Sequence, residues 1–298
     1  MISNLIQVKK PNTLEGERIF SILIPSWNNL KYLQNCIYSI RKNSFFRHQI
    51  IVHVNEGNDG TLEWIDKQPD VDYTFSSVNI GICFALNACR KLVDTSYIAY
   101  MNDDMYVCPD WDKYLYEEIQ TIGHPYFFLS ATAIEPFSGN NCCIYRSFGE
   151  DLNCFDEEKL LREFEKLDGN DWMGATWPPN VLHTSLWDLV GGYSVEFSPG
   201  FYSDPDFSMK LWQAGVRLFK GVHKSRVYHF GSKSTKRIDK GTGYQKFILK
   251  WGITSGSFTK YFLQRGELFN GMLPQNVSLS RSIVAKNFMK RFVASYRM

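Results

Sequence analysis

The sequence lacks any spaced pairing of cysteines. Its 298 residues include seven cysteines, an odd number, and no Cys-x-x-Cys occurs. Disulfide-stapled secreted domains and structural zinc sites both need regularly spaced cysteine pairs. We therefore expect a protein of a reducing compartment, the cytoplasm, with no structural zinc ion.

Long apolar runs and an excess of one charge are also missing. No stretch approaches the ~20 apolar residues that a membrane-spanning helix needs, and residues 1–13 lack the apolar core of a signal peptide. The net charge is +2, so no global basic excess indicates a nucleic-acid partner. We expect a soluble or peripheral protein that does not bind nucleic acid.

The residues that are present can form a large folded core. Hydrophobic residues make up 44% and charged residues 21% of the chain, which suits one α/β domain with an appendage. The run 19–24 is a short apolar strand stopped by Pro25, and Leu33, Ile37 and Ile40 then follow at helical spacing. This alternation predicts a mostly parallel sheet flanked by helices.

The alternation extends from residue 19 to about residue 230. We expect strands over 19–24, 50–54, 73–76, 97–101, 126–133, 216–219 and 226–229, and helices over 61–66, 82–92, 156–167 and 203–213. Residues 1–238 would then form one domain, with a first half over about 19–108 and a second half over about 109–238. Residues 239–298 lose the alternation and are predicted to form a helical extension.

Three polar clusters fall at the ends of predicted strands. They are 26–28, 55–59 and 102–104. Ligands of parallel sheets bind beyond the carboxyl ends of the strands. We therefore expect these clusters to converge on one crevice.

Asp103 and Asp104 form the most informative of these clusters. Successive side chains of an extended chain point in opposite directions, so one carboxylate can face a ligand hydroxyl while the other faces a cation. Mg²⁺ and Mn²⁺ both suit such hard oxygen ligands. The alternative is a helix-capping Asp pair, and taken alone the pair would favour that interpretation.

Four motifs in order resemble those of the family 2 glycosyltransferases. Phe20 to Asn28 resembles their opening strand, and Asp59-Gly60-Thr61 resembles the start of their second helix. Asn79-Ile80-Gly81 followed by Asn87, and the strand ending at Asp104, resemble their next two motifs. The resemblance covers about residues 19–230. It implies a GT-A fold, a nucleotide-sugar donor and a divalent metal, Mn²⁺ or Mg²⁺.

The resemblance also implies roles for single residues. Ser26 and Asn28 would lie by the base and ribose, Asn79 and Asn87 would shape the nucleotide pocket, and Asp103 would meet the ribose or the sugar. Asp104 would bind the metal. Family members usually have an acidic residue at the end of the second strand that contacts the base, and Glu56 or Asn55 is the expected substitute here.

The second half of the chain supplies a candidate base. Ser203-Asp204-Pro205-Asp206 resembles the family's Glu-Asp-x-Asp segment, with Ser203 in place of Glu. Asp204 matches the residue taken as the catalytic base, because a positioned carboxylate can remove the proton of an acceptor hydroxyl. Helix capping is the alternative for Asp204. Asp206 would position the acceptor or cap the helix.

Two further residues complete the expected site. Trp177 is a candidate for stacking on an acceptor sugar, with a packing role as the equal alternative. His229 ends a predicted strand where many GT-A enzymes place a metal ligand, and a structural role is again the alternative. The basic segment 231–237 that follows it resembles a mobile lid.

The expected function is transfer of a sugar from a nucleoside-diphosphate sugar, most simply a UDP-sugar, to a glycan or glycoconjugate hydroxyl. One displacement would invert the anomeric centre. The rival from another class is a catalytically inactive module that binds nucleotide or glycan. A dinucleotide oxidoreductase is disfavoured, because no Gly-x-Gly-x-x-Gly follows a strand.

The last residues of the chain are basic and amphipathic. Ile283, Val284, Phe288, Phe292 and Val293 share one helical face. We favour a helix that packs this face on the main domain. A helix lying on the inner face of a membrane is the alternative.

Overall fold

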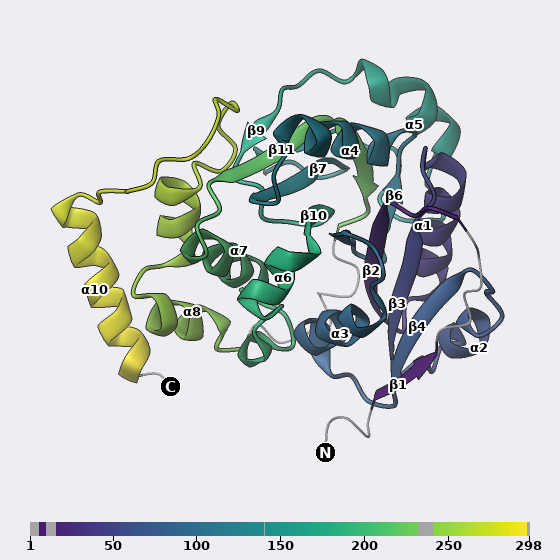
Figure 1. Cartoon of the computed structure of the whole chain (residues 1–298), viewed down its shortest axis with the longest axis horizontal. Coiled ribbons are helices and arrows are strands. Elements are labelled where there is room, and N and C mark those ends of the chain that lie inside the picture. The colour runs from purple at the N-terminus through teal and green to yellow at the C-terminus, as the bar shows by residue number, and fades with distance from the viewer. Residues whose placement is uncertain (1–5, 10–15, 140, 232–240, 297–298) are drawn as a thin grey trace.

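The centre of the molecule is one large mixed sheet (Figure 1). The structure is a computed structural model that describes residues 6–9, 16–139, 141–231 and 241–296. The strand order is β1-β4-β3-β2-β5-β10-β7-β11-β6, with β8 paired to β7 and β9 paired to β11. Helices pack on both faces of the sheet, which confirms the expected α/β class.

The first half of the chain builds the parallel part of the sheet. Its strands are β1 (Ile6–Lys9), β2 (Phe20–Trp27), β3 (Gln49–Asn55), β4 (Val71–Ser76) and β5 (Tyr97–Tyr100). Its helices are α1 (Leu30–Asn43), α2 (Thr61–Ile65) and α3 (Gly81–Cys89). Strands β2 to β5 pair in parallel, and only β1 is antiparallel, on the outer edge of β4. The predicted order of strands and helices is confirmed here.

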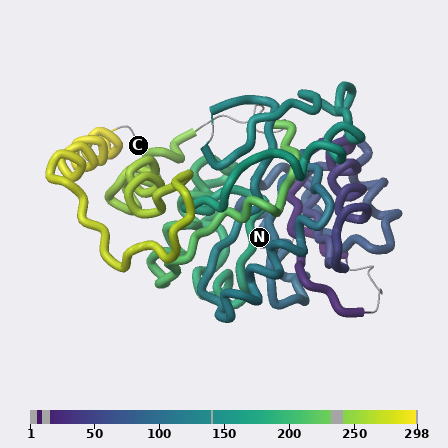
Figure 2. Tube along the Cα trace, turned by 90° about the horizontal axis from the view of Figure 1, so that it is seen from above, coloured from purple at the N-terminus to yellow at the C-terminus, as the bar shows by residue number. Residues whose placement is uncertain are grey.

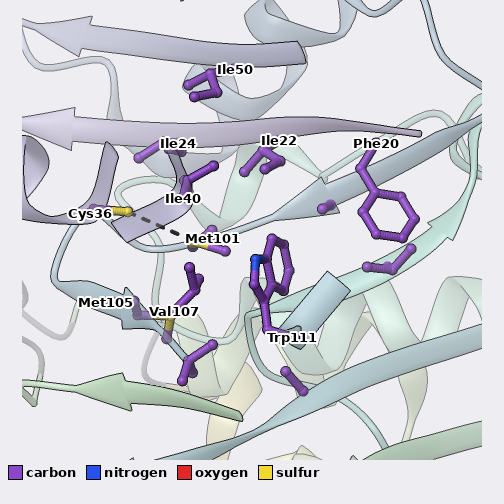
Figure 3. Close-up of a cluster of buried hydrophobic side chains, with 14 of the residues drawn as sticks. Phe20, Ile22, Ile24, Cys36, Ile40, Ile50, Met101, Met105, Val107 and Trp111 are labelled. Carbon is purple, nitrogen blue, oxygen red and sulfur yellow. Dashed lines mark hydrogen bonds between the residues drawn. The ribbon is translucent and has the colours of Figure 1, made fainter. Parts of the chain in front are cut away.

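The alternation of side chains along β2 explains how the layers are held together. Ile22 and Ile24 point into a core shared with α1 and α4, whereas Leu23 points into a second core on the other face. Figure 3 shows the first of these cores, with Trp111 among the β2 side chains. Each buried aliphatic side chain of this size contributes about 1.5–3 kcal/mol to folding.

The predicted end of the first strand was too early. Strand β2 runs through Pro25 to Trp27, and Pro25 lies opposite His53 of β3 in the parallel register. Proline removes one backbone donor, but its neighbours still pair, so the strand continues. The longer strand places Ser26 at the carboxyl edge of the sheet, where ligands of parallel sheets bind.

The second half is mixed rather than parallel. Its strands are β6 (Met105–Val107), β7 (Phe127–Glu135), β8 (Cys143–Tyr145), β9 (Trp172–Met173), β10 (Asn180–His183) and β11 (Leu218–His229). Its helices are α4 (Trp111–Ile122), α5 (Glu157–Glu163), α6 (Thr184–Val190) and α7 (Ser203–Gln213). The two strands expected over 216–219 and 226–229 are one strand, β11, with an irregularity between Val222 and Arg226.

The C-terminal segment does not form a core of its own. It contains α8 (Gly243–Trp251), α9 (Ser255–Ser257), a π-helical turn (Phe258–Phe262) and α10 (Arg281–Tyr296). Phe247 and Phe258 are fully buried in the same cluster as residues of α3 and α7. Residues 241–273 are therefore built into the main domain, whereas α10 lies at its outer edge (Figures 1 and 2).

Among the described residues, no helix is both long enough and apolar enough to cross a bilayer.

Candidate active site

A cavity of about 620 Å³ opens at the carboxyl ends of the parallel strands. It brings together residues from β2, the turn after β5, the end of β11, the first turn of α7 and the C-terminal segment. The predicted convergence of the strand-end clusters is therefore seen for Ser26, Asn55 and Asp103. A cavity of this size suits a ligand as large as a nucleotide-sugar.

Seven of the predicted residues line this cavity and fall into two groups. The strand-end group consists of Ser26, Asp103, Asp104 and His229, with Asn79 beside it on the loop before α3. The loop-and-helix group contains the predicted Trp177 and Asp204, together with Arg265.

Asp103 is held in place through both of its carboxylate oxygens. Ser26 Oγ donates to Asp103 Oδ2 over 2.7 Å, and Asn29 Nδ2 donates to Asp103 Oδ1 over 3.0 Å. The side chain is almost fully buried. Both oxygens of Asp103 are therefore fixed in position as hydrogen-bond acceptors at the cavity wall. Such a group can receive hydrogen bonds from ligand hydroxyls.

Asp104 and His229 lie side by side at the ends of neighbouring segments. His229 Nε2 is 3.4 Å from Asp104 Oδ1, and His229 Nδ1 is 2.7 Å from Glu135 Oε1. Burial alone would lower the pKa of His229, but the charges of Asp104 and Glu135 raise it to about 10. The two carboxylates therefore favour the protonated form of His229.

The same pair offers a partial ligand set for a metal ion. His229 Nε2 is buried and makes no hydrogen bond, and it faces an oxygen of Asp104. Within the described ranges, no group of three or more His, Cys, Asp or Glu side chains is placed to hold a metal ion. Asp104 and His229 are a candidate pair of ligands, one carboxylate and one imidazole. These residues fit a Mn²⁺ or Mg²⁺ ion that completes its coordination with ligand phosphate oxygens and water.

Asp204 occupies the first turn of α7 and lines the cavity. Burial raises the pKa of this carboxyl to about 7, although a hydrogen bond from Tyr193 opposes the shift. That bond is long, with Tyr193 Oη 3.4 Å from Asp204 Oδ1. A carboxylate with a pKa near neutrality is well matched to accept a proton from a hydroxyl.

Trp177 and Arg265 form a stacked pair on the cavity wall. The Arg265 guanidinium lies 4.1 Å from the centre of the Trp177 ring. The backbone carbonyl of Trp177 accepts a hydrogen bond from Ser130 Oγ over 2.9 Å, which ties the loop to β7. The pair offers a flat aromatic surface together with a cation, which suits contact with a sugar that carries polar or anionic groups.

Arg265 was missed by the sequence analysis. It lies in the C-terminal segment, more than 80 residues along the chain from Trp177. No motif or periodicity surrounds it, and only the packing of Phe258 and Leu263 into the main core brings it to the cavity. Ser255, Gly256 and Thr259 of the same segment also line the cavity.

Two predicted residues lie away from the cavity wall. Asn87 holds the backbone of Tyr193 with two hydrogen bonds, of 2.7 and 2.9 Å. Asp206 is fully buried and binds Lys250 Nζ and Trp251 Nε1, over 2.9 and 2.8 Å. Both side chains therefore make contacts with the surrounding protein, and their predicted roles at the ligand stay predictions.

Two others lie behind Trp27, which itself lines the cavity. Glu56 Oε2 accepts hydrogen bonds from Trp27 Nε1 and Asn28 Nδ2, over 2.8 and 2.9 Å. Asn28 Oδ1 in turn accepts a bond from the backbone of Asn58. Neither Asn28 nor Glu56 contributes to the cavity wall; instead they set the position of Trp27.

The expected lid over 231–237 falls, apart from Gly231, outside the described residues.

Asn79 supports the turn that opens the cavity on the α3 side. Its Oδ1 accepts a hydrogen bond from the backbone of Gly81 over 2.9 Å. Gly81 has a positive φ of 75°, and a Cβ there would come within 2.8 Å of the Pro199 backbone. The turn therefore needs glycine at this position.

Comparison with known proteins agrees with this geometry. Residues 21–141 match the family model described as glycosyl transferase family 2. Chondroitin synthase of Pasteurella multocida is 24% identical over 243 residues, which cover 74% of this chain. The match spans only 22% of that relative, about a fifth of its length.

Solved structures share the fold at low sequence identity. The crystal structure of S. aureus TarS residues 1-349 superposes with a TM-score of 0.53 at 12% identity, over 94% of this chain and 72% of that one. The complex of TarS 1-349 with UDP-GlcNAc gives a TM-score of 0.53 at 14% identity, over 94% of this chain and 73% of that one. The motif order and the match over residues 21–141 make this part of the chain similar to the family 2 glycosyltransferases, and the shared fold agrees with a GT-A fold.

Proposed function

We propose that this protein is an inverting glycosyltransferase that moves a sugar from a UDP-sugar to a hydroxyl of a glycan or glycoconjugate. One observation carries the proposal. A single cavity holds an anchored carboxylate pair, Asp103 and Asp104, and a separate carboxylate, Asp204, whose pKa is near 7. A donor and a base for the acceptor both have a place in such a cavity.

The strand-end group would hold the donor. Asp103 has a fixed orientation and a buried position, which suit hydrogen bonds from the hydroxyls of the ribose or the transferred sugar. The solved TarS complexes contain UDP and UDP-GlcNAc. That likeness supports UDP as the nucleotide here.

Asp104 and His229 would hold Mn²⁺ or Mg²⁺. The metal would supply positive charge that offsets the charge developing on the diphosphate. Asp104 alone would leave the coordination weak, and the orphaned Nε2 of His229 supports it as the second ligand. Glu135 would orient the imidazole through Nδ1, in the way that carboxylates orient metal-binding histidines elsewhere.

Asp204 would act as the base in one displacement. The acceptor oxygen loses its proton to Asp204 and forms a bond to the anomeric carbon. The bond from that carbon to the diphosphate oxygen breaks, and UDP leaves with the electron pair. Because attack and departure occur on opposite faces, an α-linked donor would give a β-linked product.

Trp177 and Arg265 would bind the acceptor. Arg265 interacts electrostatically with Cys143, which in turn interacts with Glu135. An aromatic face packs against sugar C–H groups, and the guanidinium can bind a polar or anionic substituent.

The catalytically inactive alternative is not favoured. Its support was Ser203 in place of the family's Glu, together with the altered end of the second strand. Ser203 is buried, and its hydroxyl donates to the carbonyl of Gly200 over 2.6 Å, which is a structural contact. The substitution leaves Asp204 at the cavity. Location in the cytoplasm stays a prediction.

The test is a panel of nucleotide-sugars, with and without Mn²⁺, read by thermal shift and by donor hydrolysis. We expect one UDP-sugar to raise the melting temperature and to be hydrolysed slowly, with both effects larger with Mn²⁺. Asp104→Asn is the matched control and should lose the Mn²⁺-dependent part. The absence of both stabilisation and hydrolysis with every donor would contradict the proposal. A retained anomeric configuration in the product would contradict inversion.

A further inference from the structure

Helix α10 is attached to the rest of the molecule by a narrow strip. Only Asn287 and Ala294 are buried, and Ile283 is half-buried. Asn287 Oδ1 accepts hydrogen bonds from Thr254 and Ser257, and the helix packs on α8. The contact is therefore small and partly polar.

The apolar face of α10 points away from the domain. Phe288 is 71% exposed and Tyr296 is 78% exposed, and Val284, Met289, Phe292 and Val293 are also exposed. This contradicts the expectation that Val284, Phe288, Phe292 and Val293 would pack inward. At 3.6 residues per turn, the exposed apolar side chains form one broad face opposite the strip that packs on α8. A helix that exposes such a face has a binding partner to cover it.

The charges beside this face are all of one sign. Lys286 and Lys290 follow one border of the apolar face and Arg291 follows the other, while Arg281 lies at its start. Residues 268–298 contain five Lys or Arg and no Asp or Glu. The surface that covers α10 must therefore accept aromatic side chains and carry negative charge around them.

A second copy of this chain fits these features poorly. A two-fold interface centred on α10 would place the same basic helix against itself, so that the Lys and Arg residues would face one another. An anionic lipid surface meets both demands, because its headgroups attract Lys and Arg and its acyl boundary accepts Phe, Met and Val. Helix α10 also forms the outermost element on its side of the molecule in two perpendicular views, so that a flat surface can reach it (Figures 1 and 2).

We propose that α10 binds the surface of a membrane that contains anionic lipid. The helix lies along the interface with Phe288 and Phe292 inserted, and Lys286, Lys290 and Arg291 contact the headgroups. The strip around Asn287 and Ala294 stays on α8 and links the domain to the surface. This contact is independent of the transfer reaction and does not rest on it.

The test is co-sedimentation of the full chain with vesicles of phosphatidylcholine alone, or of phosphatidylcholine mixed with phosphatidylglycerol. We expect binding to the mixed vesicles and much weaker binding to phosphatidylcholine alone. The variant Lys286→Gln/Lys290→Gln/Arg291→Gln should bind the mixed vesicles on the order of 100-fold more weakly. The variant Phe288→Ser/Phe292→Ser should also lose most of its binding, because it removes the inserted aromatic groups.

A matched control removes the same charge elsewhere. Lys31, Lys67 and Lys91 are exposed and lie outside α10. The affinity of the variant Lys31→Gln/Lys67→Gln/Lys91→Gln for the mixed vesicles should lie within about threefold of that of the unchanged protein, since the charges that it removes are distant from α10. Equal losses in the two triple variants would overturn the proposal, because net charge rather than α10 would then cause binding.

Hydrogen exchange on the unchanged protein avoids any risk that a variant misfolds. We expect mixed vesicles to slow exchange in 281–296 and to leave β2 and β3 unaffected. No binding to mixed vesicles, or no protection of 281–296, would overturn the proposal. A dimer in light scattering that the Phe288→Ser/Phe292→Ser variant dissociates would also overturn it, in favour of a second copy.

Discussion

The two groups that line the cavity differ in how the chain builds them. The strand-end group comes from neighbouring segments of one sheet, where Ser26 and Asp103 lie at the ends of the paired strands β2 and β5. The loop-and-helix group joins α7, the Trp177 loop and a C-terminal segment that includes Arg265. Local motifs mark most of the first group. In the second group Asp204 stands in a motif, whereas packing between distant segments brings Arg265 to the cavity. In the proposed function, the first group binds the donor and the second handles the acceptor.

The largest expected effect is a loss of kcat when Asp204 of the loop-and-helix group is changed. Asp204→Asn should lower kcat by about 10²–10⁴-fold, because the acceptor hydroxyl loses its base. Transfer assays with the preferred donor measure this loss. Burial raises the pKa of Asp204 to about 7, so above that pH the folded state holds a charge that folding disfavours. At alkaline pH, the melting temperature of Asp204→Asn should therefore be equal to or higher than that of the unchanged protein.

Asp206→Asn is the matched control for this change. Asp206 lies two residues from Asp204 on the same helix. Its carboxylate binds Lys250 and Trp251 instead of lining the cavity. We expect lower stability and a kcat within about threefold of the unchanged protein. A kcat loss as large as that of Asp204→Asn would contradict the division between the two residues.

The pH dependence should report the same group. A base with a pKa near 7 is protonated, and inactive, at lower pH, so kcat/KM should fall about tenfold per pH unit below that pKa. Above it, kcat/KM should level off as Asp204 becomes fully charged. A profile of kcat/KM between about pH 5 and 9 measures this. A flat profile would show that Asp204 does not limit the reaction.

A smaller effect should separate donor from acceptor binding. Arg265→Gln should raise the KM for the acceptor by about tenfold, since one charged contact and its stacking on Trp177 are lost. Its affinity for UDP should not change. Ser26→Ala should weaken the binding of UDP and leave the KM for the acceptor unchanged, because it removes a hydrogen bond that holds Asp103. Equal effects of both variants on UDP affinity would contradict the comparison.

The smallest effect on activity is expected for Asn87→Ala. Its side chain supports the Tyr193 backbone from a position off the cavity wall. The variant should lower the free energy of unfolding by about 1–3 kcal/mol, as two partly buried hydrogen bonds are lost. Urea denaturation measures this. Asn153→Ala, at an exposed position, should leave the free energy of unfolding unchanged within about 0.5 kcal/mol.

The order of strands and helices in the first half could be predicted because each element carries its own periodicity. Leu33, Ile37 and Ile40 predicted the buried face of α1, and all three are buried. Short strands such as β6 and β10 carry no such signal, since their pairing partners are far away in sequence. The direction of the α10 apolar face was wrong for a related reason. Helical spacing shows which residues share a face, and it does not show what covers that face.

The site followed the same rule. Asp104, Asp204 and His229 stand in motifs and line the cavity as predicted. Asn87 and Asp206 stand in the same motifs, yet their side chains bind the surrounding protein. Adjacent positions on a helix point in different directions, so a motif alone does not separate a ligand contact from a supporting one. Arg265 has no motif and required the three-dimensional packing.

Calorimetric titration of UDP in the presence of Mn²⁺ tests the division of the cavity most directly. It would compare the unchanged protein with Asp104→Asn and Asp204→Asn. The account predicts that Asp204→Asn binds UDP with unchanged affinity, and that Asp104→Asn loses the part of the affinity that depends on Mn²⁺. Loss of UDP binding in Asp204→Asn, or a full Mn²⁺ effect in Asp104→Asn, would contradict it.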